Sequence, residues 1–362
     1  MDKKYKLLEK LYKNNVECAS KFWMQYTEDT QDWIQRKWKP KSFIYIDSDG
    51  EKIKNKKIIT YIDGLVIPPQ WKNTLISPNI DNHILVVWFD AKSRKQYIYN
   101  DRWSEARKLI NSYKLILFWE NLWNIRARYK KLLKWEVWSF EYCLGAFLFF
   151  LDETVIRVGN PCYLDDNGTI WLSTLSSKNV LRKKSSIYLE FRWKSKKNHS
   201  IKIDNKKLKN VLKQLCALDN EFIFTYTKWN KKYNLHPSQT NDYMSEIWTD
   251  LVSGKDFRTW HASLIVFSDF IENLFPSIPD TKRKKVILES FDDAAQKLWN
   301  TRTILKNSYA HAWLVETAEE KRFLTNYEKV QGVKKLRNLS QTESEFLSFL
   351  KLLYKNNTPF ET

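Results

Sequence analysis

The sequence predicts an α+β protein. A small β-rich N-terminal domain at 1–105 is followed by a mainly α domain at 106–362 that contains an inserted three-stranded sheet. Two patterns support this division: short segments rich in β-branched and aromatic residues fill the first part, and helical periodicity begins near Glu105. Three more β-rich segments then interrupt the helical pattern. A chain of 362 residues is long enough for two or three domains with substantial cores.

The N-terminal domain is predicted from a helix and several strands. Residues 1–25 have the pattern of a short helix. The segment SFIYIDSDGEKI at 42–53 is β-rich on both sides of Asp49-Gly50, a pair typical of a hairpin turn. Two further strands are expected in HILVVWFD at 83–90 and KQYIYND at 95–101.

The second domain is expected to begin with helices at 105–133 and 139–156. The inserted sheet is predicted from TIWLSTL at 169–175, SIYLEFRW at 186–193 and NHSIKID at 198–204. The last two segments flank four residues, 194–197, of which three are lysines, so a lysine-bearing hairpin is expected. From residue 206 onward, helices are expected to the end of the chain.

One stretch near the C-terminus, 290–316, has the pattern of two helices joined by a turn. The first helix is expected to end near Leu298, and a short polar turn follows at Asn300 and Thr301. Thr301 is a suitable N-cap for the second helix, which carries Tyr309. A single tyrosine in such a pattern is usually a half-buried core residue. A role as a nucleophile therefore has to be supported by motifs elsewhere in the chain.

The charge of the chain indicates its kind of partner. There are 61 lysines and arginines against 42 acidic residues, a net charge of +19, which favours nucleic acid or an anionic membrane surface. The longest apolar run, at 143–151, is too short to span a bilayer, and the charged N-terminus has no signal-peptide pattern. The 4 cysteines are scattered without a Cys-x-x-Cys pair, so neither a disulfide framework nor a zinc site is expected. These features predict a cytoplasmic, nucleoid-associated protein that binds nucleic acid without a metal.

Several motifs, in order, resemble those of the poxvirus-type bacterial DNA topoisomerase IB family, and the resemblance covers about 26–316. Any one of them is a weak signal, but their common order is specific. The motifs are GLVIPPQW at 64–71, RKQYIYNDRW at 94–103, TVIRVGN at 154–160, NGTIWLSTLSSKNV at 167–180, LEFRWKSKKNH at 189–199, KDFRTWH at 255–261 and LWNTRTILKNSYAH at 298–311.

The resemblance implies a DNA topoisomerase that relaxes supercoils through a transient 3′-phosphotyrosyl link, with neither ATP nor metal as cofactor. It also implies a monomer that clamps the duplex with its N-terminal domain. Carried over to this sequence, the catalytic residues would be Tyr309, Arg157, Lys194, Arg258 and Asn300. Many relatives have histidine in place of Asn300.

The chemistry of these residue types fits that reaction. Attack by a tyrosine hydroxyl on a phosphodiester expels a 5′-oxygen and concentrates negative charge on the non-bridging oxygens. Guanidinium groups bind phosphoryl oxygens bidentately and stay protonated. A lysine can protonate the leaving oxygen as a general acid, and an asparagine can donate to a phosphoryl oxygen. The covalent tyrosyl link keeps the phosphodiester energy available for resealing.

Two alternatives remain open from the sequence. A tyrosine site-specific recombinase uses a similar catalytic set, but it also needs an element for protein exchange, and the β-rich N-terminal domain with its IPPQW segment argues against it. The other alternative is a DNA-binding protein that has lost catalysis.

Glycine and tryptophan have unusual abundances. The chain has 7 glycines and 17 tryptophans, whereas glycine alone usually makes up roughly 7% of residues. Our hypothesis is that the source organism reads UGA as glycine and that this translation rendered it as tryptophan. The alternative is a lineage that favours tryptophan and uses ordinary UGG codons. The positions where the resembled family usually has glycine are Trp33, Trp38, Trp88, Trp171, Trp193 and Trp299.

Overall fold

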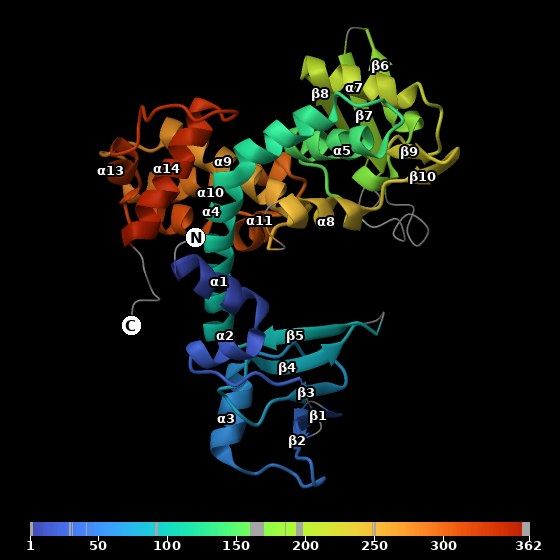
Figure 1. The fold of residues 1–362 in the computed structure, drawn as a ribbon. Coiled ribbons are helices and arrows are strands. Elements are labelled where there is room, and N and C mark those ends of the chain that lie inside the picture. The colour runs from blue at the N-terminus through green and yellow to red at the C-terminus, as the bar shows by residue number, and fades with distance from the viewer. Residues whose placement is uncertain are drawn as a thin grey trace. The chain divides into compact units, whose positions relative to one another are not determined.

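The computed structural model divides the chain into two compact units, Met1–Asn111 and Ser112–Thr362 (Figure 1). The division falls within the long helix α4 (Asp101–Leu132). The predicted α+β class is confirmed, since a small sheet precedes a mainly helical part that holds a three-stranded sheet. The structure describes residues 3–28, 30, 32–40, 42–90, 93–159, 170–184, 186–192, 198–247, 249 and 251–356.

The first unit is built on a five-stranded antiparallel sheet in the order β2-β1-β3-β4-β5. Its apolar face packs on α3 through buried residues such as Ile34, Ile62 and Val86. The side chain of Asn55 accepts a hydrogen bond from the backbone N–H of Lys57 and so caps α3. The elements are α1 (Lys3–Lys13), α2 (Asn15–Lys21), β1 (Ile34–Lys39), β2 (Ser42–Ile46), α3 (Lys56–Gly64), β3 (Thr74–Ile76), β4 (Ile84–Phe89) and β5 (Lys95–Tyr99).

Two predictions for this unit need correction. The single helix expected at 1–25 is two helices, because Asn14 ends α1 and its side chain caps α2 by accepting from Glu17 N–H. The hairpin expected at 42–53 has its turn in place, with Gly50 at a φ of +85°, but β2 pairs with β1 instead. The returning segment forms no regular strand there: an isolated bridge pairs Ile46 with Lys52, and Ile53 N–H donates to the Tyr45 carbonyl at 3.0 Å.

The second unit begins with the rest of α4 and with α5 (Phe140–Thr154), in agreement with the two helices predicted. Ser139 caps α5 by accepting a hydrogen bond from Tyr142 N–H. The helix ends at Val155, which has a left-handed φ of +50°. Twelve residues of α5 are buried, so this helix forms a central part of the core.

The inserted sheet has three antiparallel strands, β6 (Val180–Lys183), β7 (Ser186–Arg192) and β8 (Asn198–Ile203). The last two strands were predicted, but the first was placed wrongly at 169–175. That segment contains the short 3₁₀ helix η1 (Leu172–Thr174). Its backbone is not available to a sheet, because the N–H groups of Leu172 and Ser173 bind the carbonyls of Arg157 and Val158 at 3.1 and 3.2 Å. A second 3₁₀ helix, η2 (Ser177–Asn179), leads into β6.

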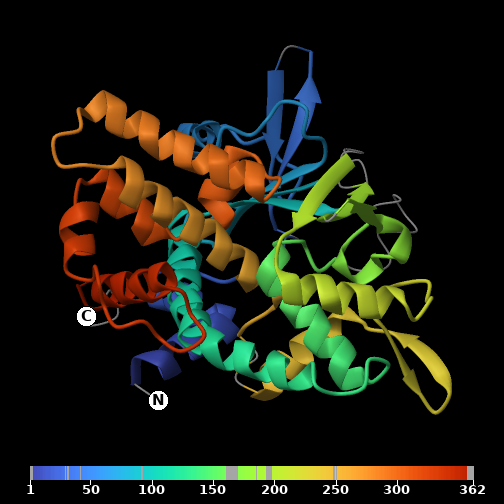
Figure 2. The same ribbon diagram turned by 90° about the horizontal axis from the view of Figure 1, so that it is seen from above.

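The rest of the unit is mainly helical, as predicted, with one exception. A hairpin of β9 (Thr225–Lys228) and β10 (Lys231–Asn234) interrupts the helices. Figure 2 shows α9 and α10 running side by side. The helices are α7 (Lys206–Cys216), α8 (Pro237–Ile247), α9 (Gly254–Asn273), α10 (Asp280–Lys297), α11 (Arg302–Ser308), α12 (Ala312–Glu319), α13 (Phe323–Glu328) and α14 (Gln341–Asn356).

Aromatic side chains form the core between α4, α9 and α14. Trp260 on α9 lies against Trp119 on α4 and Phe346 on α14, with ring centroids 4.8 and 5.4 Å apart. These rings fix α9, the helix that carries Arg258. Within the described residues, no helix is long and apolar enough to cross a bilayer.

Candidate active site

Tyr309 lies at the C-terminal end of α11 rather than inside a longer helix, which corrects the prediction for this stretch. Thr301 caps α11 as predicted, since its hydroxyl accepts a hydrogen bond from Ile304 N–H at 3.3 Å. The Ser263 hydroxyl donates to the Tyr309 carbonyl at 3.1 Å and accepts from His311 N–H at 3.0 Å. These bonds fix the backbone on both sides of Tyr309, whose residue surface is only 8% exposed.

Arg258 approaches the tyrosine from α9. Its guanidinium lies 5.3 Å from the centre of the Tyr309 ring. One nitrogen donates to the carbonyl of Leu298 at 2.8 Å and another donates to the carbonyl of Val155. Arg258 is 2% exposed, and this burial lowers its pKa to about 10, so the group remains a cation at neutral pH.

Arg157 and Asn300 meet at the same place, although they are far apart in sequence. A guanidinium nitrogen of Arg157 donates to Oδ1 of Asn300. The backbone of Arg157 is fixed by Leu172 N–H, and the backbone of Asn300 by its N–H bond to the Ala295 carbonyl at 2.8 Å. The Asn300 Nδ2 group is buried without a hydrogen-bond partner among the described residues, so it is a donor available to a ligand.

The surroundings alter the acidity of the Tyr309 phenol. Burial raises its pKa, but the charges and hydrogen bonds of Arg258 and Arg157 outweigh this effect and hold the pKa below the ordinary value. Neighbouring cations favour the phenolate, and burial alone would oppose it. The ammonium of Lys255 adds a third positive charge, 5.6 Å from the ring centre. The position of Lys255, one turn before Arg258 on the same helix, is the signal that could have identified it from the sequence.

Four of the five predicted catalytic residues therefore lie together: Arg157, Arg258, Asn300 and Tyr309. The fifth, Lys194, lies outside the described residues, as does Trp193. The strands that flank this segment pair in antiparallel fashion, with Arg192 opposite Asn198. The role of Lys194 stays a prediction.

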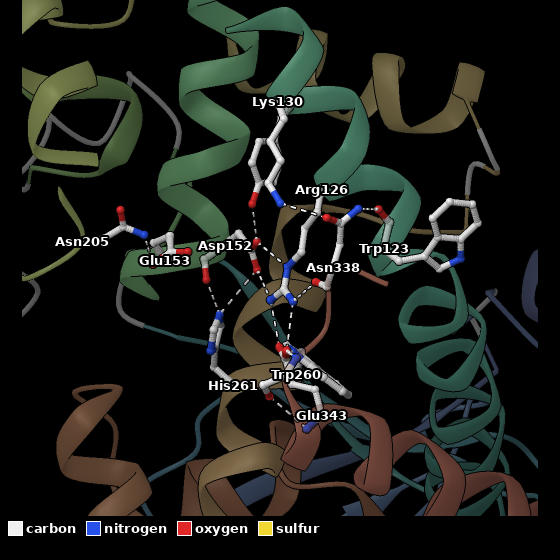
Figure 3. A network of polar contacts seen from close by, with 12 residues as sticks. Trp123, Arg126, Lys130, Asp152, Glu153, Asn205, Trp260, His261, Asn338 and Glu343 are labelled. Carbon is white, nitrogen blue, oxygen red and sulfur yellow. Dashed lines mark hydrogen bonds and ion pairs between the residues drawn. The ribbon is translucent and has the colours of Figure 1, made fainter. Parts of the chain in front are cut away.

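A buried polar network, which the sequence did not reveal, joins α4, α5 and α14 to α9 (Figure 3). Arg126 on α4 binds Asp152 on α5 at 2.7 Å and Glu343 on α14 at 2.8 Å. Tyr129 donates to Asp152 at 2.8 Å, and the Trp260 indole donates to Glu343 at 3.1 Å. The network connects three helices to α9 just beyond Arg258, so we infer that it holds the helix carrying that arginine.

Replacing Asp152 with asparagine is expected to destabilise the second unit strongly, because it leaves the buried Arg126 with one carboxylate and Tyr129 without its charged acceptor. Breaking a buried charge pair costs about 3–5 kcal/mol. The matched control is Asp292→Asn, which breaks the exposed ion pair with Arg302 and should cost far less, because solvent screens an exposed pair. Urea unfolding followed by tryptophan fluorescence gives both values, and equal shifts in the two variants would contradict the role of the network.

The same network should make the stability of the folded protein depend on pH. Burial raises the pKa of Glu343, but the hydrogen bond and charge of Arg126 outweigh it, and the pKa falls from its ordinary value of 4.5 to about 2. A depressed carboxyl pKa stabilises the folded state above the ordinary value, and this stability is lost as the pH falls toward the folded-state pKa. We expect the urea midpoint to fall between about pH 4.5 and 2, and the fall to be smaller in Glu343→Gln.

The arrangement of Tyr309, two guanidinium groups and an amide donor suits one class of reaction. It can stabilise negative charge on a phosphodiester while a tyrosine oxygen attacks the phosphorus. This is the chemistry of enzymes that break and rejoin DNA strands through tyrosine. Within the described residues, no cluster of three or more metal-binding side chains is present.

Comparisons with known proteins define the family. The model of the eukaryotic DNA topoisomerase I catalytic core matches residues 107–336, and that of the bacterial DNA topoisomerase IB N-terminal domain matches residues 42–90. The first match covers more than half of the chain, so the chain belongs to the type IB DNA topoisomerase family and is a DNA isomerase.

Viral relatives extend the similarity over most of the chain. A DNA topoisomerase 1B of Acanthamoeba polyphaga mimivirus is 25% identical over 301 residues, which are 81% of this chain and 90% of the relative. A DNA topoisomerase I of monkeypox virus is 24% identical over 278 residues, 76% of this chain and 83% of the relative. These relatives are topoisomerases, which favours the topoisomerase over the recombinase interpretation.

Proposed function

We propose that Tyr309 is the nucleophile with which this topoisomerase breaks one strand of duplex DNA. The phenol oxygen attacks a backbone phosphorus, a P–O bond forms to tyrosine, and the P–O bond to the 5′-oxygen breaks. The phenol proton leaves to solvent, and the expelled 5′-oxygen takes up a proton. The reverse attack by the 5′-hydroxyl reseals the strand and frees the tyrosine, so no net bond is consumed.

The roles of the other residues follow from where charge develops. Arg157 and Arg258 neutralise the non-bridging oxygens, and the Nδ2 group of Asn300 donates to one of them. Lys194 protonates the 5′-oxygen. The single observation that carries the proposal is the phenol of Tyr309, buried beside Arg258 and Arg157 with a lowered pKa.

The proposal also covers the oligomeric state of the enzyme and its location in the cell. We propose a monomer that closes around the duplex, with the N-terminal unit as one part of the clamp, in the cytoplasm and associated with the nucleoid. Its net charge of +19 supports contact with many phosphates. Light scattering of the free protein and of its complex with a short duplex tests the stoichiometry, and two chains per duplex would overturn the monomer.

A plasmid assay with protein purified from the source organism tests the reaction. Supercoiled plasmid should relax fully, and denaturant added during the reaction should trap protein on the 3′ end of a nick. Mass spectrometry of the trapped peptide should place the DNA on Tyr309. Binding without relaxation would support the DNA-binding alternative, and attachment to another residue would overturn the assignment.

The reaction conditions provide a separate prediction. Relaxation should continue in excess chelator without nucleotide, because the proposed steps use only side chains. Raising the salt from about 50 to 200 mM should weaken DNA binding by about 10³-fold or more if six or more phosphates are contacted, because binding releases counterions. A strict magnesium requirement for cleavage would contradict the mechanism.

A further inference from the structure

Three tryptophans have a backbone conformation that suits glycine. Trp23, Trp229 and Trp299 have φ values of +54°, +49° and +51°. Bulky side chains rarely adopt this left-handed region, because their Cβ atoms crowd the backbone, whereas glycine enters it freely. Tryptophan at such a position is a genuine outlier, and it occurs three times among the residues that the structure describes.

Two of the three occupy the same motif at the end of a helix. After α2, Trp23 N–H binds the Ser20 carbonyl and Met24 N–H binds the Ala19 carbonyl. After α10, Trp299 N–H binds the Gln296 carbonyl at 3.2 Å and Asn300 N–H binds the Ala295 carbonyl at 2.8 Å. Both are Schellman motifs with tryptophan at the left-handed position, where glycine is the usual residue.

The third tryptophan lies in a tight β-turn. Trp229 and Asn230 connect β9 to β10, with Lys228 paired to Lys231 across the turn. Both turn residues have positive φ, at +49° and +58°, as a type I′ turn requires. Glycine and asparagine are the residues that this turn favours. The Trp229 side chain is 82% exposed, so packing does not explain its presence.

Two other tryptophans, Trp103 and Trp260, are ordinary core residues. Trp260 is 0% exposed and its indole donates to Glu343 at 3.1 Å. Trp103 is 7% exposed and packs edge-on against His83, with ring centroids 4.9 Å apart. Neither has a positive φ. Trp103 and Trp260 therefore pack in the core with ordinary backbone conformations, whereas the three tryptophans with positive φ occupy positions that suit glycine.

We propose that residues 23, 229 and 299 are glycine in the native protein, encoded by UGA codons that the source organism reads as glycine. The structure supports the sequence hypothesis at Trp299 and extends it to Trp23 and Trp229, which the sequence argument did not select. The remaining candidates fall outside this argument: Trp33, Trp38, Trp88 and Trp171 lack a positive φ, and Trp193 lies outside the described residues.

Glycine at 299 is also a positioning residue for Asn300, a role that rests on the proposed function. Residue 299 sets the left-handed turn that places the Asn300 side chain against Arg157. The Trp299 indole extends toward the inserted sheet, with its ring centroid 5.2 Å from that of His199 on β8. Replacing tryptophan with glycine would relieve the backbone at residue 299 and remove the ring that lies beside His199 on β8.

Codons and native peptides test the proposal directly. The gene should have UGA at positions 23, 229 and 299 and UGG at 103 and 260. Mass spectrometry of the protein purified from the source organism should find glycine at the first three positions and tryptophan at the last two. Tryptophan in native peptides at 23, 229 or 299 would overturn the proposal at that position.

Variants of the chain as printed test the structural and catalytic parts separately. Trp23→Gly, Trp229→Gly and Trp299→Gly should each raise the urea midpoint, whereas Trp103→Gly and Trp260→Gly should lower it. Trp299→Gly should also speed single-turnover cleavage by about tenfold or more, because small misplacements of reacting groups cost up to about 10²-fold. Trp23→Gly and Trp229→Gly should leave that rate within about twofold.

The outcomes distinguish the two claims. Glycine in native peptides with no gain of cleavage in Trp299→Gly would overturn the positioning role and leave the recoding supported. Glycine in native peptides from a protein that forms no tyrosyl adduct would overturn the proposed function alone. A lower urea midpoint in all three glycine variants would contradict the structural argument.

Discussion

Replacing Tyr309 with phenylalanine is expected to abolish strand cleavage, religation and the covalent adduct. The substitution removes the one oxygen that forms the bond to phosphorus and leaves the ring in place beside Arg258. Loss of a covalent nucleophile lowers turnover by a factor on the order of 10⁶, which is below detection in plasmid relaxation. The variant should be compared with its parent in both the printed and the Trp299→Gly background.

The control for this loss is DNA binding together with a matched tyrosine. Tyr309→Phe should bind duplex DNA nearly as tightly as its parent, because phosphate contacts dominate affinity. Tyr327→Phe removes a phenol oxygen that donates to Glu345 at 3.0 Å on α14 and should relax plasmid normally. Retained relaxation in Tyr309→Phe would exclude Tyr309 as the nucleophile.

The second large effect is expected for Arg258→Lys. Lysine keeps the positive charge but cannot bind a phosphoryl oxygen while it also holds the carbonyls of Val155 and Leu298. Loss of one preorganised donor should slow single-turnover cleavage by about 10²–10³-fold. Arg302→Lys, at an exposed pair with Asp292, is the matched control and should cleave at the parental rate. Equal rates for all three proteins would contradict the role of Arg258.

The pH profile of cleavage gives an independent measurement. In the parent, burial raises the pKa of Tyr309 and the two arginines together lower it, with a net decrease. Arg258→Gln removes one of these charges, so the pKa should rise and the pH of half-maximal cleavage should move upward. If the pH of half-maximal cleavage were the same in Arg258→Gln and in the parent, the idea that ionisation of the Tyr309 phenol controls the cleavage rate would be wrong.

The sequence predicted much of the site because its members lie in local motifs. Thr301 was predicted as a cap from its place before a helical pattern, and Tyr309 was a candidate because the motif at 298–311 resembles that of the topoisomerase family. The class of fold followed from the change of periodicity near residue 105. These signals are short-range, and the structure reproduces them in the helix ends and strands described above.

Other features depend on contacts that no local pattern records. The segment 169–175 is rich in β-formers, but the N–H groups of Leu172 and Ser173 bind the carbonyls of Arg157 and Val158 instead of a neighbouring strand. The hairpin at β9 and β10 was missed because Trp229-Asn230 is not a recognised turn pair. Arg126 binds both Asp152 and Glu343, and these three residues come from three different helices, so no local sequence pattern indicates their contact.

The two carbonyls that hold Arg258 have a consequence for the energy of catalysis. Val155 and Leu298 are the C-caps of α5 and α10, so the guanidinium bridges the negative ends of two helix dipoles. The dipoles offset part of the cost of burying the cation and fix its orientation before DNA arrives. An incoming phosphate therefore meets a charge that needs little reorganisation energy, which is the condition under which electrostatic stabilisation of a transition state is largest.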